Sequence, residues 1–177
     1  MIYTYKNIKE KKINTDICVI GSGAGGSACA YQLSKAGYQV ALLEAGSFFT
    51  PNDFSQRENL MYPKLFYDNG GRRTKNRAIR VLHGHGVGGS TLHNINLCKR
   101  TPKEIIDHWN LNNFTYEKFK PYFELIEKYL GVREIPSYRR NKNNQILKKG
   151  VDQLGYQGGP LQDNRKGCLG SGFCELG

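Results

Sequence analysis

Residues 16–46, DICVIGSGAGGSACAYQLSKAGYQVALLEAG, decide the fold of this chain. The first five of them form a short β-branched run, which is typical of a strand buried on both faces. The composition of residues 27–35 then predicts a helix packed closely on a sheet, and Gly37 is placed to end it. A second apolar run at residues 39–43 predicts another strand. The stretch therefore predicts a strand, a turn, a helix and a second strand, the start of an α/β fold.

The turn between the first strand and the helix reads G-x-G-x-x-G, from Gly21 through Gly23 to Gly26. The first glycine of this motif allows a tight turn, the second lets the backbone approach a pyrophosphate, and the third lets helix and strand pack closely. Glu44 lies 23 positions after Gly21, close to the ~20 at which an acidic side chain accepts a hydrogen bond from a ribose hydroxyl. This order of features predicts a Rossmann-like dinucleotide site, whereas a glycine-rich turn without a ligand is the alternative.

Length, charge and cysteines narrow the class of protein. The 177 residues are 38% hydrophobic, no apolar run approaches the ~20 residues of a membrane helix, and the basic segment 1–12 lacks the apolar core of a secretory signal. A cytoplasmic location is therefore expected. The net charge of +11 permits nucleic acid or anionic membrane as a partner, but we favour a basic surface around a site for an anionic dinucleotide. The five cysteines are expected to be reduced thiols, and no metal site is expected.

A second informative stretch is RVLHGHGVGGSTLHNINLCKR, residues 80–100. Its four glycines form another turn that a ligand could approach closely. The alternation of apolar and polar residues over 92–97 could bring polar groups together at a site. A glycine-rich hairpin with buried, hydrogen-bonded Asn and His side chains remains the alternative.

The rest of the chain carries weaker signals. Residues 47–67, which are aromatic and contain two prolines, read as an irregular excursion, and the basic run at 72–80 reads as a solvated loop. Helices are expected from Thr101 onwards, over 116–130 with Gly131 as its stop, and over 144–154. The aromatic stripe of the 116–130 helix is expected to pack in a core.

Together these stretches resemble the glucose–methanol–choline oxidoreductases, flavoenzymes that oxidise alcohols. The likeness rests on GSGAGG with LLEAG, on GHGVGGSTLHNINLCKRTP and on GCLGSGFCELG. It implies an α/β fold in which residues 13–177 form an incomplete Rossmann-like FAD-binding domain. This domain would contain a helical excursion, and its C-terminal part would be missing. The start of a substrate domain is placed from about residue 103. A missing C-terminal segment or a companion chain would then be a partner.

The resemblance also implies which residues bind the cofactor FAD. The pyrophosphate and the adenosine ribose would contact the first motif, with Glu44 on the ribose, and the second motif would lie along the pyrophosphate and the flavin. The implied cofactor-binding residues are Gly21, Ser22, Gly23, Ala24, Gly25, Gly26, Glu44, Ala45, Gly88, Gly89, Ser90, His93 and Asn94. The substrate would be a small-molecule alcohol. The family's catalytic histidine has no match here, so no catalytic residue is assigned and the chain is expected to be inactive alone.

His93 stands where some members of that family bond a histidine covalently to the flavin. The resemblance thus suggests the hypothesis that His93 is bonded covalently to FAD. The alternative is a buried, hydrogen-bonded histidine. Two other functions remain open. One is a nicotinamide-dependent dehydrogenase, whose first strand–helix–strand unit would look alike. The other is a basic dinucleotide- or nucleic-acid-binding protein without catalysis, although nucleic acid is the less expected partner.

Overall fold

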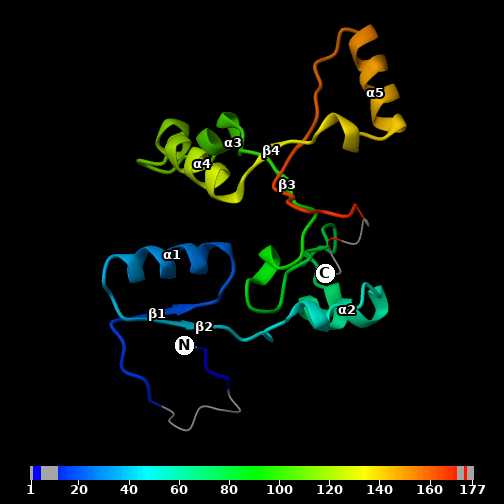
Figure 1. Ribbon diagram of the computed structural model, residues 1–177. Coiled ribbons are helices and arrows are strands. Elements are labelled where there is room, and N and C mark those ends of the chain that lie inside the picture. The colour runs from blue at the N-terminus through cyan, green and yellow to red at the C-terminus, as the bar shows by residue number, and fades with distance from the viewer. Residues whose placement is uncertain (1, 5–11, 171–173, 175–177) are drawn as a thin grey trace. The chain divides into compact units, whose positions relative to one another are not determined.

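The structure, a computed structural model, describes residues 2–4, 12–170 and 174. Most of the basic segment 1–12, and most of the last seven residues, therefore lie outside the described residues. The described chain is mixed α/β and divides into two compact units. The first takes in the described residues up to Asn94 together with Cys174, and the second begins at Ile95 (Figure 1). Each unit is described below by itself.

The first unit begins with the predicted strand–turn–helix–strand. Strands β1 (Ile17–Ile20) and β2 (Val40–Leu43) pair in parallel, with Ile17 opposite Val40 and Ile20 opposite Leu43. Helix α1 (Ala24–Lys35) connects them and lies along the strand pair (Figure 1). It begins three residues earlier than expected, and Gly37 follows it with a left-handed φ of +97°. The prediction of a βαβ unit is confirmed.

The prediction that β1 is buried on both faces is wrong. Its residues alternate between half-buried and exposed, and Ile20 is 85% exposed. In β2, Leu42 and Leu43 are 40% and 52% exposed. Within the described residues this sheet has two strands, and α1 covers one of its faces. A strand buried on both faces needs a neighbouring layer on each side, which the described residues do not supply here.

The irregular excursion predicted for 47–67 is also wrong in part, because it contains helix α2 (Glu58–Leu65). Met61 and Leu65 lie one turn apart on this helix, are fully buried, and form with Phe66 the hydrophobic core of the unit. Pro63 lies inside the helix and cannot donate the usual backbone hydrogen bond. The packing of Met61 and Leu65 outweighs that loss.

Short 3₁₀ turns complete the first unit at Pro51–Asp53, Tyr67–Gly70 and Gly89–Thr91. The basic run at 72–80 is a largely exposed loop, as predicted. It is held by a bridge between Arg73 and Arg80 and by the Arg80 guanidinium, which donates to the carbonyl oxygen of Gly70 at 2.5 Å.

The second unit combines three helices with a small antiparallel sheet. The helices are α3 (Lys103–His108), α4 (Tyr116–Leu130) and α5 (Lys142–Gln153). Strand β5 (Gln162–Asp163) pairs with β3 (Leu97–Cys98) on one side and β4 (Arg133–Glu134) on the other. The bounds predicted for α4 are confirmed, including the left-handed Gly131 that ends it. Helix α5 begins two residues earlier than expected, because the side chain of Asn141 caps it.

The expectation that the α4 stripe is core holds for only part of it. Phe119 and Phe123 are half-buried, with ring centroids 6.0 Å apart, and Trp109 meets Phe119 edge-on. Tyr122 and Ile126, by contrast, are 67% and 50% exposed. Among the described helices, none is both long and apolar enough to cross a membrane.

Candidate functional site

The three glycines of the first turn differ in whether the fold requires glycine at their position. Gly21 has φ +91°, a conformation that L side chains rarely adopt, and its N–H donates to the Leu43 carbonyl at 2.7 Å. A Cβ on Gly26 would lie 1.9 Å from the carbonyl oxygen of Gly21, so only glycine lets α1 pack on the end of β1. Gly23 differs from both, since its φ is −64° and an added Cβ would meet nothing within 4 Å. The fold of the described chain does not itself require glycine at position 23.

The second glycine-rich stretch packs directly against the first. A Cβ on Gly89 would lie 3.1 Å from the Cα of Gly23, and one on Gly46 would lie 2.3 Å from the N of Gly86. Gly88 has a left-handed φ of +99°. Three segments of chain, at the ends of β1 and β2 and in the second stretch, therefore meet with their backbones nearly in contact.

Glu44 lies at the centre of this meeting point. One carboxylate oxygen accepts hydrogen bonds from the N–H and the hydroxyl of Ser22, at 2.9 and 2.7 Å, and the other accepts from the Gly46 N–H at 2.8 Å. Burial alone would raise the pKa of this carboxyl, but the bonds from Ser22 and Gly46, with the charge of His85, lower it below its ordinary value. Glu44 is therefore held as a carboxylate that faces backbone donors.

An open groove of about 500 Å³ lies between the two glycine-rich stretches. Seven of the predicted site residues line it: Gly21, Gly23, Ala24, Glu44, Ala45, Gly89 and Ser90. Six other residues line the groove that the sequence motifs do not single out: Ile20, Leu43, Tyr67, His83, Gly84 and Thr91. Ile20, Leu43, His83, Gly84 and Thr91 adjoin or lie within the recognised motifs. Tyr67 has no such signal, because residues 47–67 carry no recognised motif.

The other predicted site residues lie around the groove rather than on its lining. Ser22 is 2% exposed and lies behind it. The Asn94 side chain donates to the backbone carbonyl of Thr91 at 3.3 Å, within its own loop. Gly88 donates its N–H to the hydroxyl of Ser22 at 2.9 Å. Gly25 and Gly26 belong to the first turn of α1.

His93 is buried, with 4% of its surface exposed. Its Nε2 lies 3.0 Å from the carbonyl oxygen of Leu65, and its ring packs against Phe66 with centroids 4.3 Å apart. The imidazole thus belongs to the core built around α2, and it is not among the side chains that line the groove.

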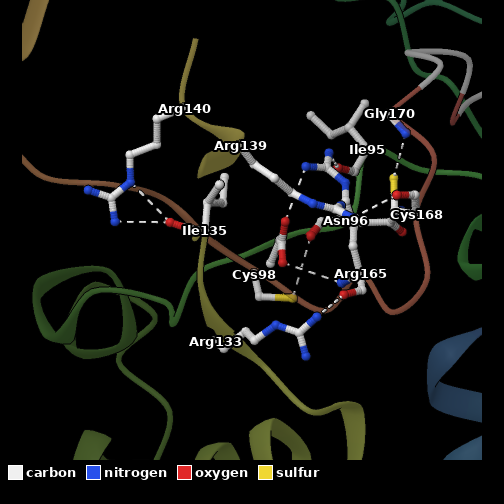
Figure 2. A network of polar contacts seen from close by, with 11 residues as sticks. Ile95, Asn96, Cys98, Arg133, Ile135, Arg139, Arg140, Arg165, Cys168 and Gly170 are labelled. Atoms are coloured by element: carbon white, nitrogen blue, oxygen red, sulfur yellow. Dashed lines mark hydrogen bonds and ion pairs between the residues drawn. The ribbon is translucent and has the colours of Figure 1, made fainter. Parts of the chain in front are cut away.

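A second polar cluster lies in the second unit, around β4, β5 and residues 165–170 (Figure 2). Its guanidinium groups donate to backbone carbonyls: Arg139 to Cys168 and Arg165 to Ile95, each at 2.7 Å, and Arg133 to Arg165. The N–H of Gly170, helped by Arg139 and Arg165, lowers the pKa of the Cys168 thiol. These contacts join loops to the small sheet, so we assign the cluster a structural role.

Among the described residues, the cysteines and acidic side chains give no sign of a metal centre. All five cysteines lie among the described residues and are free thiols. In the part of the chain that the structure describes, no group of three or more His, Cys, Asp or Glu side chains could hold a metal ion.

Comparison with known proteins assigns the chain to a family. The GMC oxidoreductase family model matches residues 62–177, which include the second glycine-rich stretch. The chain belongs to the GMC oxidoreductase family. A second model, FAD dependent oxidoreductase, matches residues 16–105 and so covers both glycine-rich stretches and Glu44. GMC membership confirms the resemblance identified from the sequence, and the mixed α/β structure is consistent with part of a Rossmann-like FAD-binding fold.

Similarity to individual relatives of this GMC oxidoreductase chain agrees with the family assignment. A long-chain-alcohol oxidase of Arabidopsis thaliana is 36% identical over 148 residues, 81% of this chain and 19% of the relative. Another from the same plant is 32% identical over 94% of this chain and 23% of its own length. A cholesterol oxidase of Mycobacterium tuberculosis is 30% identical over 82% of this chain and 26% of its own length. The chain therefore spans about a fifth to a quarter of the curated relatives it matches.

Proposed function

We propose that this chain is the FAD-binding portion of a flavin-dependent oxidoreductase that acts on the CH–OH group of an alcohol. The observation that carries the proposal is Gly23. Neither its backbone angles nor its protein neighbours require glycine, yet it lines the groove between the two glycine-rich stretches. A ligand that approaches the backbone closely supplies the missing reason.

The residues present fit FAD. The N-cap residue of α1 is Gly23, whose lack of a side chain leaves the first amide groups of the helix uncapped and suited to a pyrophosphate. Glu44, held by Ser22 and Gly46, would accept a hydrogen bond from a ribose hydroxyl. Gly88, Gly89, Ser90 and Asn94 would lie along the pyrophosphate and the flavin. Bound FAD supplies the acceptor for the hydride that leaves the alcohol carbon.

The substrate class is inferred from the relatives. Long-chain-alcohol oxidase and cholesterol oxidase are both named for alcohols with a large apolar part, and we propose an alcohol of that kind for the protein to which this chain belongs. We assign the base that receives the hydroxyl proton to none of the 177 residues. The absence of this base from the chain, and the inactivity of the chain alone, stay predictions.

Family membership favours this function over the two alternatives. A nicotinamide-dependent dehydrogenase would share the βαβ unit, but the FAD dependent oxidoreductase model also spans the second glycine-rich stretch. A basic nucleic-acid-binding protein would bind through its net charge of +11, and its binding would fall steeply with salt. FAD binding through the groove would instead depend on Gly23.

The test is the flavin content of the purified 177-residue chain. An absorbance spectrum should show a flavin band after incubation with FAD and gel filtration, and Gly23→Val should abolish the band, because the added side chain would occupy the space of the pyrophosphate. Gly150→Ala is the matched control, since its Cβ also meets nothing within 4 Å but lies in α5, far along the chain. Equal flavin content in Gly23→Val and wild type would contradict the proposed site.

The same sample addresses the covalent tether through His93. A flavin that stays with the acid-precipitated protein, and is lost in His93→Ala, would establish the tether. A flavin released into the supernatant would leave His93 as the buried, hydrogen-bonded residue that contacts Leu65.

A further inference from the structure

Ser22 is the residue through which the two glycine-rich stretches and Glu44 are connected. Its hydroxyl donates to a carboxylate oxygen of Glu44 at 2.7 Å and accepts the Gly88 N–H at 2.9 Å, although Gly88 lies 66 positions further along the chain. Its backbone N–H donates to the same oxygen of Glu44. The side chain is 2% exposed. The single proton of the hydroxyl is therefore committed to Glu44, and the group is enclosed by protein.

This geometry excludes the simplest role for a serine in a phosphate-binding turn. A hydroxyl that binds phosphate must direct its proton at the ligand, but this one directs it at Glu44. The hydroxyl also does not line the groove. Ser22 thus acts on a ligand through other residues.

We propose that Ser22 is a positioning residue, which holds the Glu44 carboxylate for the ribose of FAD and fixes the Gly88 loop against the first glycine turn. The inference rests on the proposed function. A carboxylate has about four lone-pair directions, of which Ser22 and Gly46 use three. The remaining acceptor capacity is held in one orientation before the cofactor arrives, so FAD need not restrain a mobile side chain.

The chain of bonds from the Gly88 N–H through the Ser22 hydroxyl to Glu44 also connects the second glycine-rich stretch with the carboxylate proposed to bind the ribose. Each bond polarises the next, so a hydrogen-bonded chain is stronger than its separate members. A disturbance of the second glycine-rich stretch should consequently reach the ribose contact. Removing the Ser22 hydroxyl should weaken FAD binding even though the hydroxyl does not touch FAD.

The test is a double-mutant cycle on FAD affinity, measured by quenching of flavin fluorescence in the 177-residue chain. Ser22→Ala should weaken FAD binding by about tenfold or more, and so should Glu44→Gln. Since Ser22 acts chiefly through Glu44, the double variant should lose far less FAD affinity than the product of the two single losses, and the small remaining loss reports the contact with Gly88. Ser27→Ala is the matched control, because this serine donates to the backbone carbonyl of Ser22 at 2.6 Å and does not contact Glu44.

A second readout separates positioning from a merely structural contribution. Loss of the hydroxyl should raise the pKa of Glu44. The fall in FAD affinity at low pH, the acid limb of the binding profile, should therefore shift to higher pH in Ser22→Ala and not in Ser27→Ala. Two histidines of the second stretch lie near Glu44. His85 interacts electrostatically with the Glu44 carboxylate, and His83 lines the same groove. A limb caused by either histidine would persist in the Glu44→Gln background, whereas the Ser22 effect would disappear there.

Ser22→Cys covers the case in which Ser22→Ala does not fold, because a thiol is similar in size to the hydroxyl but a weak donor. It should lose affinity in the wild-type background and lose little more beside Glu44→Gln. Multiplicative losses from the two sites, or an unshifted acid limb, would overturn the positioning role while leaving FAD binding intact. A wild-type chain that binds no FAD would overturn both this inference and the proposed function.

Discussion

At the scale of single residues, the ionisation of Glu44 links the site to the stability of the fold. Hydrogen bonds from Ser22 and Gly46 outweigh burial and lower the pKa of this carboxyl from its ordinary value of 4.5. A carboxyl whose pKa is lower in the folded state stabilises the fold above its unfolded-state pKa, and the contribution is lost as the pH falls through the folded-state value.

Glu44→Gln should therefore lower the free energy of unfolding by about 1.5–3 kcal/mol near pH 7. The difference between variant and wild type should narrow as the pH drops below about 4.5. Urea denaturation of the chain at a series of pH values measures both effects. A deficit that stays constant from pH 7 to pH 3 would mean that the ionised form of Glu44 is not what stabilises the fold.

At the scale of elements, the packing of α1 on β1 depends on Gly26. A Cβ there would lie 1.9 Å from the Gly21 carbonyl oxygen and 3.5 Å from a methyl group of Val19. Gly26→Ala should cost about 1–3 kcal/mol of stability, because the helix must move off the strand. Gly25→Ala is the control on the same helix, since its Cβ meets nothing within 4 Å, and it should be neutral or stabilise by up to ~1 kcal/mol. Equal denaturation midpoints for the two variants would show that helix and strand do not need this close contact.

The elements that the sequence predicted well are those with local signals. The glycines at 21, 23 and 26 marked the turn, and Gly131 marked the end of α4. The sequence does not reveal helix α2, because the stability of this helix comes from Met61 and Leu65 in a core that also draws on other segments, and Pro63 is a residue that usually interrupts a helix. The strands of the second unit are two residues long, too short for any periodicity to appear.

The same difference between local signals and contacts over long sequence distances applies to the residues of the site. Glu44 and the first glycine turn follow from spacing along about thirty residues. Tyr67 reaches the groove through the fold of α2 and the turn after it. The role of Ser22 depends on its bond to Gly88, 66 positions away, which no local pattern contains.

At the scale of the whole molecule, the described chain carries apolar surface that its own elements do not cover. Helix α5 packs against no other described helix or strand of the second unit. Ile146 and Leu147 are each 67% exposed, and Leu154 is 73% exposed. An isolated helix of 12 residues is marginal in water, and contiguous exposed apolar groups promote association.

The 177-residue chain should therefore self-associate as its concentration rises, despite a net charge of +11 that opposes contact between copies. Replacing Ile146 and Leu147 together by Gln should shift the sedimentation profile towards monomer and reduce the binding of an apolar fluorescent dye. Lys149→Gln is the control on the same helix, because it removes charge without removing apolar surface. It should leave association unchanged or strengthen it. Wild-type protein that sediments as a monomer across the micromolar range would show that α5 is covered within its own chain.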